Sequence, residues 1–227
     1  MFVVLFEVHP APGKKDEYLT LAKQLKPLLE AIEGFVDNER FESASRDGWV
    51  LSLSTWRDEK ALVRWRTQGE HHQVQKQGRG GVFADYHLRV CDVVADSTPP
   101  AGMAVIEQRL DTTLIGAAKA VTVTEIPPAA AGSSALDPAA LADQIGRARP
   151  DGHLAHELFT SIVTPGKLLL LVSWDSMACA ARWDVRTLLG GRALRHRRLR
   201  NIRDYGLEDR REAPQFFPAP HFAGGGH

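Results

Sequence analysis

Apolar positions along the first ninety or so residues alternate between the two-residue period of strands and the longer period of helices. The start of the chain is crowded with β-branched and aromatic residues, which predicts a strand. Tyr18, Leu21, Leu25, Leu28 and Ile32 then recur at helical spacing. The full pattern predicts strands at 2–9, 35–41, 49–56 and 82–94, and helices at 18–32 and roughly 59–77. Strand-helix-strand-strand-helix-strand is the order of the ferredoxin-like motif.

The chain repeats this pattern at an offset of 118 residues. Trp56 and Trp65 are nine residues apart, and Trp174 and Trp183 stand 118 positions after them. The same offset relates Glu7 to Glu125, Gly34 to Gly152 and Phe41 to Phe159. A single offset shared by so many positions indicates two copies of one structural unit.

Each predicted unit has helices on one face of its sheet only, so the other face must be covered. Two units in one chain can cover each other by packing their bare sheet faces together. The sequence therefore predicts an α+β protein made of two tandem ferredoxin-like units. The expected divisions are a first unit at 1–94, a linker at 95–116, a second unit at 117–210 and a flexible tail at 211–227.

Composition and charge narrow the class of protein. The chain is 44% hydrophobic and 25% charged, and its 28 basic residues balance 28 acidic ones. A neutral chain has no global attraction to nucleic acid or to an anionic membrane, and no apolar run approaches the roughly eighteen residues of a membrane span. Cys91 and Cys179 form neither a metal-ligand spacing nor a disulfide framework. These features predict a cytoplasmic protein without nucleic-acid or membrane partners.

Motifs around the first tryptophan pair resemble a known family. The run Ser-Thr-Trp-Arg-Asp-Glu-Lys-Ala-Leu-Val-Arg-Trp at 54–65 precedes Glu70-His71, Gln75, Gly78-Arg79 and Asp85-Tyr86. With the first strand, these residues resemble the antibiotic biosynthesis monooxygenase (ABM) domain over 1–94, and the second copy resembles it through the internal repeat. The resemblance implies a dimeric α+β barrel, formed here as a pseudo-dimer within one chain, with a pocket between sheet and helices. A further homodimer stays open.

Two adjacent histidines in the predicted second helix are the first candidates for chemistry. His72 follows Trp65 by seven positions, almost two helical turns, so both should project in nearly one direction. His71 is turned by about 100° from His72 and should lie nearer the edge. A neutral imidazole, with an unperturbed pKa near 6.5, can take a proton from a phenol. We expect His72, or else His71, to be a general base; a polar helix end is the alternative.

Other side chains complete the expected site in the first copy. Arg40 is expected to stabilise an anionic substrate by charge-assisted hydrogen bonds, and its alternative is a surface pair with Glu42 or Asp85. The remaining substrate-binding candidates are Trp65, Trp56, Phe83, Tyr86, Asn38 and Gln75. Core packing is the alternative role of the aromatic ones. In the second copy Leu189 and Gly190 replace the histidines, so the polar pocket is expected in the first.

The residues disfavour haem. The haem-degrading branch of the family places its iron-ligating histidine about ten positions after the tryptophan that corresponds to Trp65, where this chain has Gln75. The first-strand asparagine of that branch corresponds most nearly to Glu7. Zinc, phosphate-loop and dinucleotide motifs are absent from the sequence. We therefore expect no metal site and no tightly bound cofactor.

Five arginines between 192 and 200 form a second cluster, expected on a helix. Two roles fit such a cluster. It can bind an anionic ligand or a nucleic-acid phosphate, or it can be a solvated helix face paired with Asp204, Glu208 and Asp209. The sequence leaves this choice open.

Three functions follow from these patterns. The first is a monooxygenase that oxidises a small aromatic phenol- or quinol-like substrate with dioxygen. The second is a non-catalytic binding or stress-response module of the same fold. The third is a haem-binding or haem-degrading monooxygenase, which titration with haemin would separate from the others.

Overall fold

The structure, a computed structural model, describes residues 1–130, 134–192 and 194–214. The first copy contains β1 (Phe2–Pro10), α1 (Lys15–Glu30), β2 (Phe35–Ser43), β3 (Val50–Trp56), α2 (Glu59–Thr67), α3 (Gly69–Gln77), the short helical turn η1 (Gly78–Val82) and β4 (Phe83–Asp96). The second copy contains β5 (Ala120–Ile126), α4 (Pro138–Ala148), β6 (His153–Ser161), β7 (Leu168–Trp174), α5 (Met177–Arg182), α6 (Val185–Leu188) and β8 (Arg195–Gly206). Residues 215–227 of the expected tail lie outside the described residues.

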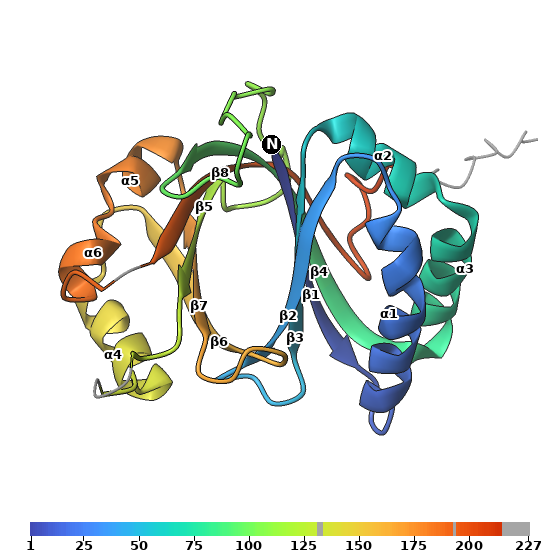
Figure 1. The fold of residues 1–227 in the computed structure, drawn as a ribbon, viewed down its shortest axis with the longest axis horizontal. Helices are drawn as coiled ribbons and strands as arrows, with labels where there is room; N and C mark the ends of the chain where they lie inside the picture. The colour runs from blue at the N-terminus through green and yellow to red at the C-terminus, as the bar shows by residue number, and fades with distance from the viewer. Residues whose placement is uncertain (131–133, 193, 215–227) are drawn as a thin grey trace, which may run out of the picture.

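The eight strands of the described residues close into one antiparallel barrel, in the order β1-β3-β2-β6-β7-β5-β8-β4. Each copy supplies four neighbouring strands, and the copies join where β2 pairs with β6 and where β4 pairs with β8. Figure 1 shows the barrel at the centre, with the helices of one copy on each side. The predicted fold of two tandem ferredoxin-like units is confirmed.

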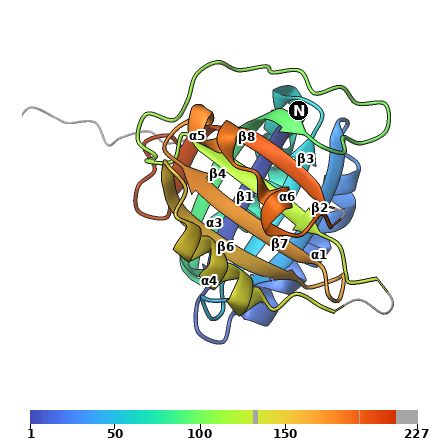
Figure 2. The same cartoon turned by 90° about the vertical axis from the view of Figure 1, so that its left-hand side faces the viewer.

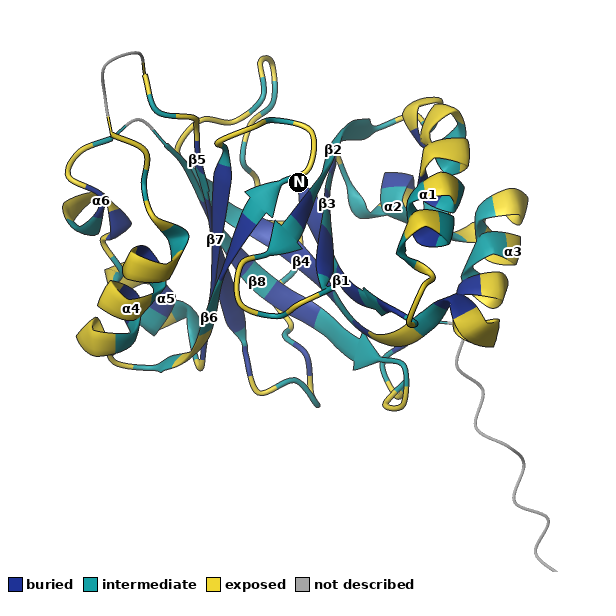
Figure 3. Cartoon of the chain, turned by 90° about the horizontal axis from the view of Figure 1, so that it is seen from below, coloured by how far each residue is buried: buried dark blue, intermediate teal, exposed yellow. Residues whose placement is uncertain are grey.

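Alternation along each strand sends one set of side chains into the barrel and the other set against the helices. The interior is filled by buried apolar residues from both copies, among them Leu5, Phe41, Val123 and Leu169. The two sheets therefore cover each other's inner faces. In Figure 2 the helices of the second copy lie over its strands, on the outside of the barrel. Figure 3 shows that the buried residues concentrate in the strands, while the outward helix faces are exposed.

Two carboxylates at equivalent positions hold charged residues inside the barrel. Glu7 accepts hydrogen bonds from Arg89 (2.6 Å) and Arg46 (2.5 Å). Glu125, its counterpart in the second copy, accepts a hydrogen bond from Arg197 (2.7 Å) and forms an ion pair with Lys167 (2.6 Å). Burial raises the pKa of Glu7, but the positive charges of Arg89 and Arg46 outweigh burial and hold that pKa below its usual value.

The second helix of the first copy is broken where the sequence pattern predicts one continuous helix over 59–77. α2 ends at Thr67 and α3 begins at Gly69, because Gln68 adopts an extended backbone conformation (φ −63°, ψ 132°). The side chain of Gln68 then caps α3 by accepting a hydrogen bond from the backbone N–H of His71 (2.7 Å). Because of this break, helical spacing counted from α2 does not predict the direction in which the residues of α3 project.

The arginine cluster near 192–200 was expected on a helix, and that expectation is wrong. Arg195–Gly206 is strand β8, which pairs with β4 on one side and β5 on the other. Arg197 is 1% exposed and donates hydrogen bonds to Glu125 (2.7 Å) and Thr55 (3.0 Å). Arg195 pairs with Asp96 (2.8 Å). The inward-facing arginines are thus bound by carboxylates inside the barrel and do not form a solvated helix face.

None of the helices in the described ranges is long and apolar enough to span a membrane.

Candidate functional site

A cavity of ≈ 210 Å³ lies between the sheet of the first copy and helices α1, α2 and α3. The family resemblance implied a pocket in this position. Most of its walls are apolar or aromatic: Val4, Phe6, Tyr18, Leu21, Ala22, Leu25, Leu29, Trp56, Leu62, Trp65, Val74, Phe83, Tyr86, Leu88 and Val90.

Eight of the nine site residues expected from the sequence line this cavity. They are Asn38, Arg40, Trp56, Trp65, His71, Gln75, Phe83 and Tyr86. The fold brings them together from β2, β3, β4, α2 and α3. Their individual roles remain predictions.

His72 is the exception, and the expectation that it shares the cavity with Trp65 is wrong. Its side chain is exposed to solvent and does not line the cavity. The expectation assumed one continuous helix, in which seven residues make almost two turns. The break at Gln68 interrupts that count, so His71 faces the cavity in place of His72.

The imidazole of His71 is fixed in position and in tautomer. Its ring stacks on the Trp65 indole, and its Nδ1 lies 2.9 Å from the Trp65 carbonyl oxygen. Because that oxygen can only accept, Nδ1 carries the hydrogen, and Nε2 is left as an acceptor 3.4 Å from Nε2 of Gln75. Burial lowers the pKa of His71 to about 4, despite the opposing effect of the hydrogen bond to Trp65. The ring is therefore neutral near pH 7.

Two serines on β3 form a polar part of the sheet wall that the sequence analysis missed. Ser52 and Ser54 line the cavity beside Asn38. Nδ2 of Asn38 donates to the Ser52 hydroxyl (3.0 Å), and the Trp56 indole donates to the Ser54 hydroxyl (2.9 Å). Their spacing was a usable signal, because Ser52, Ser54 and Trp56 alternate along one strand and so face the same side.

All fully charged residues that line the cavity are arginines: Arg40, Arg66, Arg79 and Arg210. Neither aspartate nor glutamate occurs among its described lining residues. Within the described ranges none of the four arginines forms an ion pair with a carboxylate, and the Nε atoms of Arg40 and Arg66 are buried without a hydrogen-bond partner. Arg40, Arg66 and Arg210 are partly buried, and a guanidinium removed from water without a counter-charge is costly, so this cavity favours an anionic ligand.

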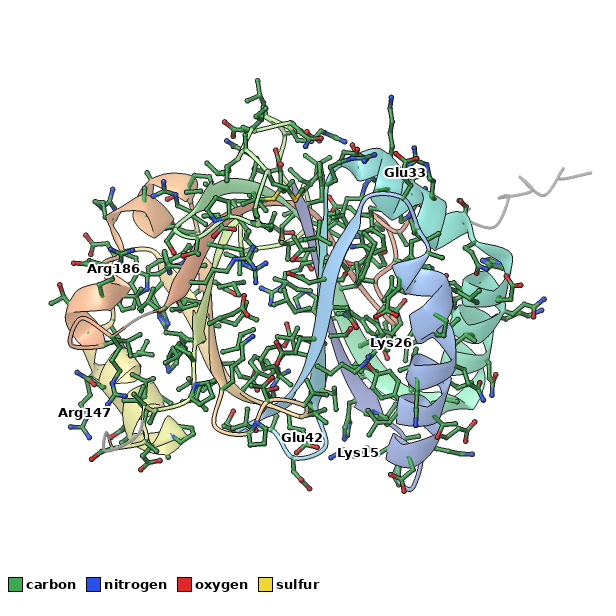
Figure 4. The ribbon with its side chains drawn as sticks, viewed as in Figure 1. Lys15, Lys26, Glu33, Glu42, Arg147 and Arg186 are labelled. Carbon is green, nitrogen blue, oxygen red and sulfur yellow. The ribbon has the colours of Figure 1, made fainter. Side chains whose placement is uncertain are left out.

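The alternative role of Arg40, a surface pair with Glu42 or Asp85, does not occur. Glu42 accepts a hydrogen bond from Lys15 instead (2.7 Å), and Figure 4 places both of these side chains at one end of the molecule, near the start of α1. The Asp85 carboxylate accepts from the backbone N–H of Tyr86 (2.7 Å). Arg40 is left facing the cavity beside the buried Tyr18. Burial raises the pKa of Tyr18, and the positive charge of Arg40 only partly opposes that rise.

One wall of the cavity comes from the end of the second copy. Tyr205 on β8 lies opposite Leu88 on β4, and Arg210, Ala213 and Pro214 follow it along the chain. In Figure 1 this segment, coloured red, passes between the first copy's sheet and its helices. The boundary of the second unit expected at residue 210 gave no indication of this contribution.

The equivalent space of the second copy is packed with apolar residues. Leu158, Leu170, Val172 and Trp174 of its sheet contact helix residues in one buried cluster. The helix residues of that cluster are Leu141, Ile145, Ala180 and Val185, with Leu189 just after α6. The candidate site therefore belongs to the first copy, as the missing histidines of the second copy predicted.

Comparison with known proteins places the chain in a family. Residues 1–77 match the sequence model of the family described as "Antibiotic biosynthesis monooxygenase". The chain is also 42% identical, over 229 residues, to a protein of Pyricularia oryzae named "Jasmonate monooxygenase ABM". The match covers 96% of this chain and 99% of that relative. The chain belongs to the antibiotic biosynthesis monooxygenase family.

Solved structures resemble this ABM chain more distantly. An anthrone oxidase-like protein is 14% identical, with 93% of this chain and 95% of that one covered and a TM-score of 0.36. A putative monooxygenase of Fusobacterium nucleatum is 11% identical, with 89% and 93% covered and a TM-score of 0.40. At these scores the likenesses carry no conclusion about function.

Proposed function

We propose that this chain is a monooxygenase that oxidises a small hydrophobic carboxylate of the jasmonate kind in the cavity of its first copy. The observation that carries the proposal is the charge of that cavity, where arginines occur without any described carboxylate. The named activity of the Pyricularia oryzae relative, which aligns over almost the whole chain, supports the same substrate class.

The size of the cavity supports a small ligand. An apolar protein cavity of about 150 Å³ admits a benzene ring. At ≈ 210 Å³ this cavity suits a single ring with short substituents, as in jasmonate, the anion of a small cyclopentanone acid. A haem or a polycyclic phenol is much larger. The size and the Gln75 position together support chemistry without haem. We propose dioxygen as the oxidant with no tightly bound cofactor: one oxygen atom enters the substrate, and an external two-electron donor reduces the other to water.

The lining also suits an amphiphilic anion. Residues such as Leu25, Leu62 and Trp56 can cover an apolar ring and chain, with a gain of about 25 cal/mol for each Å² of apolar surface buried. The arginines supply charge-assisted hydrogen bonds to a carboxylate, which are roughly twice as strong as neutral ones. The neutral His71 offers Nε2 as an acceptor at the same wall.

A small phenol or quinol is the second candidate, because aromatic rings meet around the cavity. Phe6 lies 5.7 Å from Phe83 and 5.6 Å from Tyr86 between ring centroids, and His71 stacks on Trp65. Proton transfer weighs against this candidate. With a pKa of about 4, His71 is about six units too weak to deprotonate a phenol of pKa ~10 efficiently. We propose that His71 acts as a hydrogen-bond acceptor that orients the substrate.

The test incubates the purified chain under air with jasmonic acid, with and without an external electron donor such as NADPH. We expect oxygen consumption and a product heavier than the substrate by one oxygen atom in mass spectrometry. Parallel incubations with a monocyclic phenol and with hydroquinone test the second candidate. Binding of jasmonic acid without turnover under every condition would identify a binding module. A Soret shift on titration with haemin would revive the haem hypothesis.

A further inference from the structure

Three of the four cavity arginines come from segments around Tyr86 and Tyr205, and this part of the cavity is called the corner. Arg66 comes from α2, Arg79 from η1, and Arg210 from the segment after β8. The guanidinium of Arg210 donates a hydrogen bond to the Tyr86 hydroxyl. Burial raises the pKa of Tyr86, and the positive charges of Arg210 and Arg79 act against that rise. Arg210 and Arg79 therefore bring positive charge from two separate segments to the Tyr86 phenol.

Tyr205 marks the same corner from the second copy. It lies on β8 opposite Leu88, next to the β4 strand that carries Tyr86. Burial raises the pKa of Tyr205 to about 12, against the positive charges of Arg66 and Arg210. The corner thus contains two tyrosine side chains and three guanidinium groups, with no carboxylate among the described residues that line the cavity.

Arg40 is separated from this corner by the width of the sheet. It lies on β2, and the strand order β2-β3-β1-β4 puts three strand spacings between it and Tyr86. At about 4.8 Å for each spacing, the separation is about 14 Å. The strand positions of Arg40 and Tyr86 are therefore far enough apart for variants at Arg40 and at the corner to test the two ends of the cavity separately.

The segment that carries Arg210 is held in place by several hydrogen bonds. The backbone N–H of Gly206 donates to Asp209 (2.9 Å), and that of Leu207 donates to Tyr86 (3.2 Å). The Glu212 carboxylate accepts from the Thr113 hydroxyl (2.7 Å) and from the backbone N–H of Asp204 (2.7 Å). Arg210 is therefore positioned by the fold, with its charge directed at the cavity of the other copy.

We propose that Arg66, Arg79 and Arg210 bind the carboxylate of the hydrophobic acid, and that the site of the first copy is complete only with Arg210 from the second copy. This inference rests on the proposed function. It sets the direction of the ligand, whose other end points towards Asn38, Ser52 and Ser54 on β2 and β3. It also gives the second copy, whose own equivalent space is packed, a direct part in binding.

The test measures binding of jasmonic acid and of its methyl ester, which lacks the charge, by titration calorimetry. Arg210→Met and Arg66→Met should each weaken binding of the acid about 10- to 100-fold and that of the ester less than about threefold, because a hydrogen bond to a charged group is lost. Arg211→Met is the matched control, since Arg211 is exposed and pairs with Asp209 (2.6 Å). It should bind both ligands like the wild type. Thermal unfolding of each variant checks that it is folded. Because Arg66 and Arg210 lie on different elements, one variant still tests the inference if the other does not fold.

Loss of acid binding in Arg40→Met, with the corner variants unchanged, would place the carboxylate at the other end of the cavity. That outcome overturns the inference and leaves the proposed function intact. Equal losses for acid and ester in the corner variants would also overturn it, because a packing defect would explain them. If the wild-type chain neither binds nor oxidises jasmonic acid, the proposed function fails, and the inference fails with it.

Discussion

The imidazole of His71 lies flat against the indole of Trp65, with ring centroids 4.0 Å apart and an interplanar angle of 15°. The same tryptophan accepts the His71 Nδ1 hydrogen through its backbone carbonyl (2.9 Å). Trp65 therefore buries one ring face and selects the tautomer. His71 presents Nε2 to the cavity as an acceptor, and this arrangement depends on the helix break at Gln68.

Replacing His71 by alanine should lower kcat/KM for substrate oxidation by at least about tenfold, because the substrate loses a buried hydrogen-bond partner. His72→Ala is the matched control, since that side chain is exposed on the same helix. It should change kcat/KM less than about twofold. Steady-state kinetics of both variants check the prediction, and a larger loss in His72→Ala would contradict the assignment.

The pH dependence of His71 should differ from that of an ordinary histidine. Its pKa is lowered to about 4, so its imidazole should stay neutral down to about pH 5, and substrate binding that needs Nε2 as an acceptor should persist there. Because the folded-state pKa lies below the unfolded value near 6.5, its stabilising effect is fully present above pH 6.5 and is lost as the pH falls towards 4. An NMR titration of the His71 ring resonances measures this. A midpoint at pH 6 to 7 would show that the ring is not buried as described.

Replacing Glu7 by glutamine should lower the free energy of unfolding by about 3–5 kcal/mol, because the 3% exposed Arg89 would keep its charge without a carboxylate partner. Glutamine preserves the size of the side chain, so the change isolates the charge. Glu17→Gln is the control, since Glu17 forms an exposed pair with Lys14 (2.7 Å) and its loss should have no measurable effect. Urea unfolding of both variants decides the matter. Equal stabilities would show that the interior ion pairs contribute little.

Gly78 should prove essential to the shape of the cavity. A Cβ at this position would lie 2.4 Å from the ring of Phe83, which lines the cavity. Gly78→Ala should therefore displace that ring, cost about 1–3 kcal/mol of stability and weaken ligand binding. At Gly80 a Cβ would meet nothing within 4 Å, so Gly80→Ala serves as the control. Calorimetric titration and thermal unfolding of the two variants test this, and similar behaviour of both would contradict it.

The sequence by itself determined the fold and the location of the site. The 118-residue offset between the Trp56–Trp65 and Trp174–Trp183 pairs indicated two copies of one unit, and the bare sheet faces implied that the copies pack together. Eight of the nine expected site residues line one cavity. Hydrophobic periodicity sufficed here because it depends only on the regular geometry within each strand or helix, and the repeat showed that both copies share the same order of elements.

Only the tertiary structure decided which histidine faces the cavity and which charges complete it. Helical phase predicts a direction only within a continuous helix, and the extended Gln68 ends that continuity. The arginines of β8 were assigned to a helix because their pairing with β4 and β5 involves residues about 70 to 120 positions away. Arg210 also lies far along the sequence from the residues of the first copy that line its cavity. Its position is fixed by contacts between the two copies, which no local pattern in the sequence encodes.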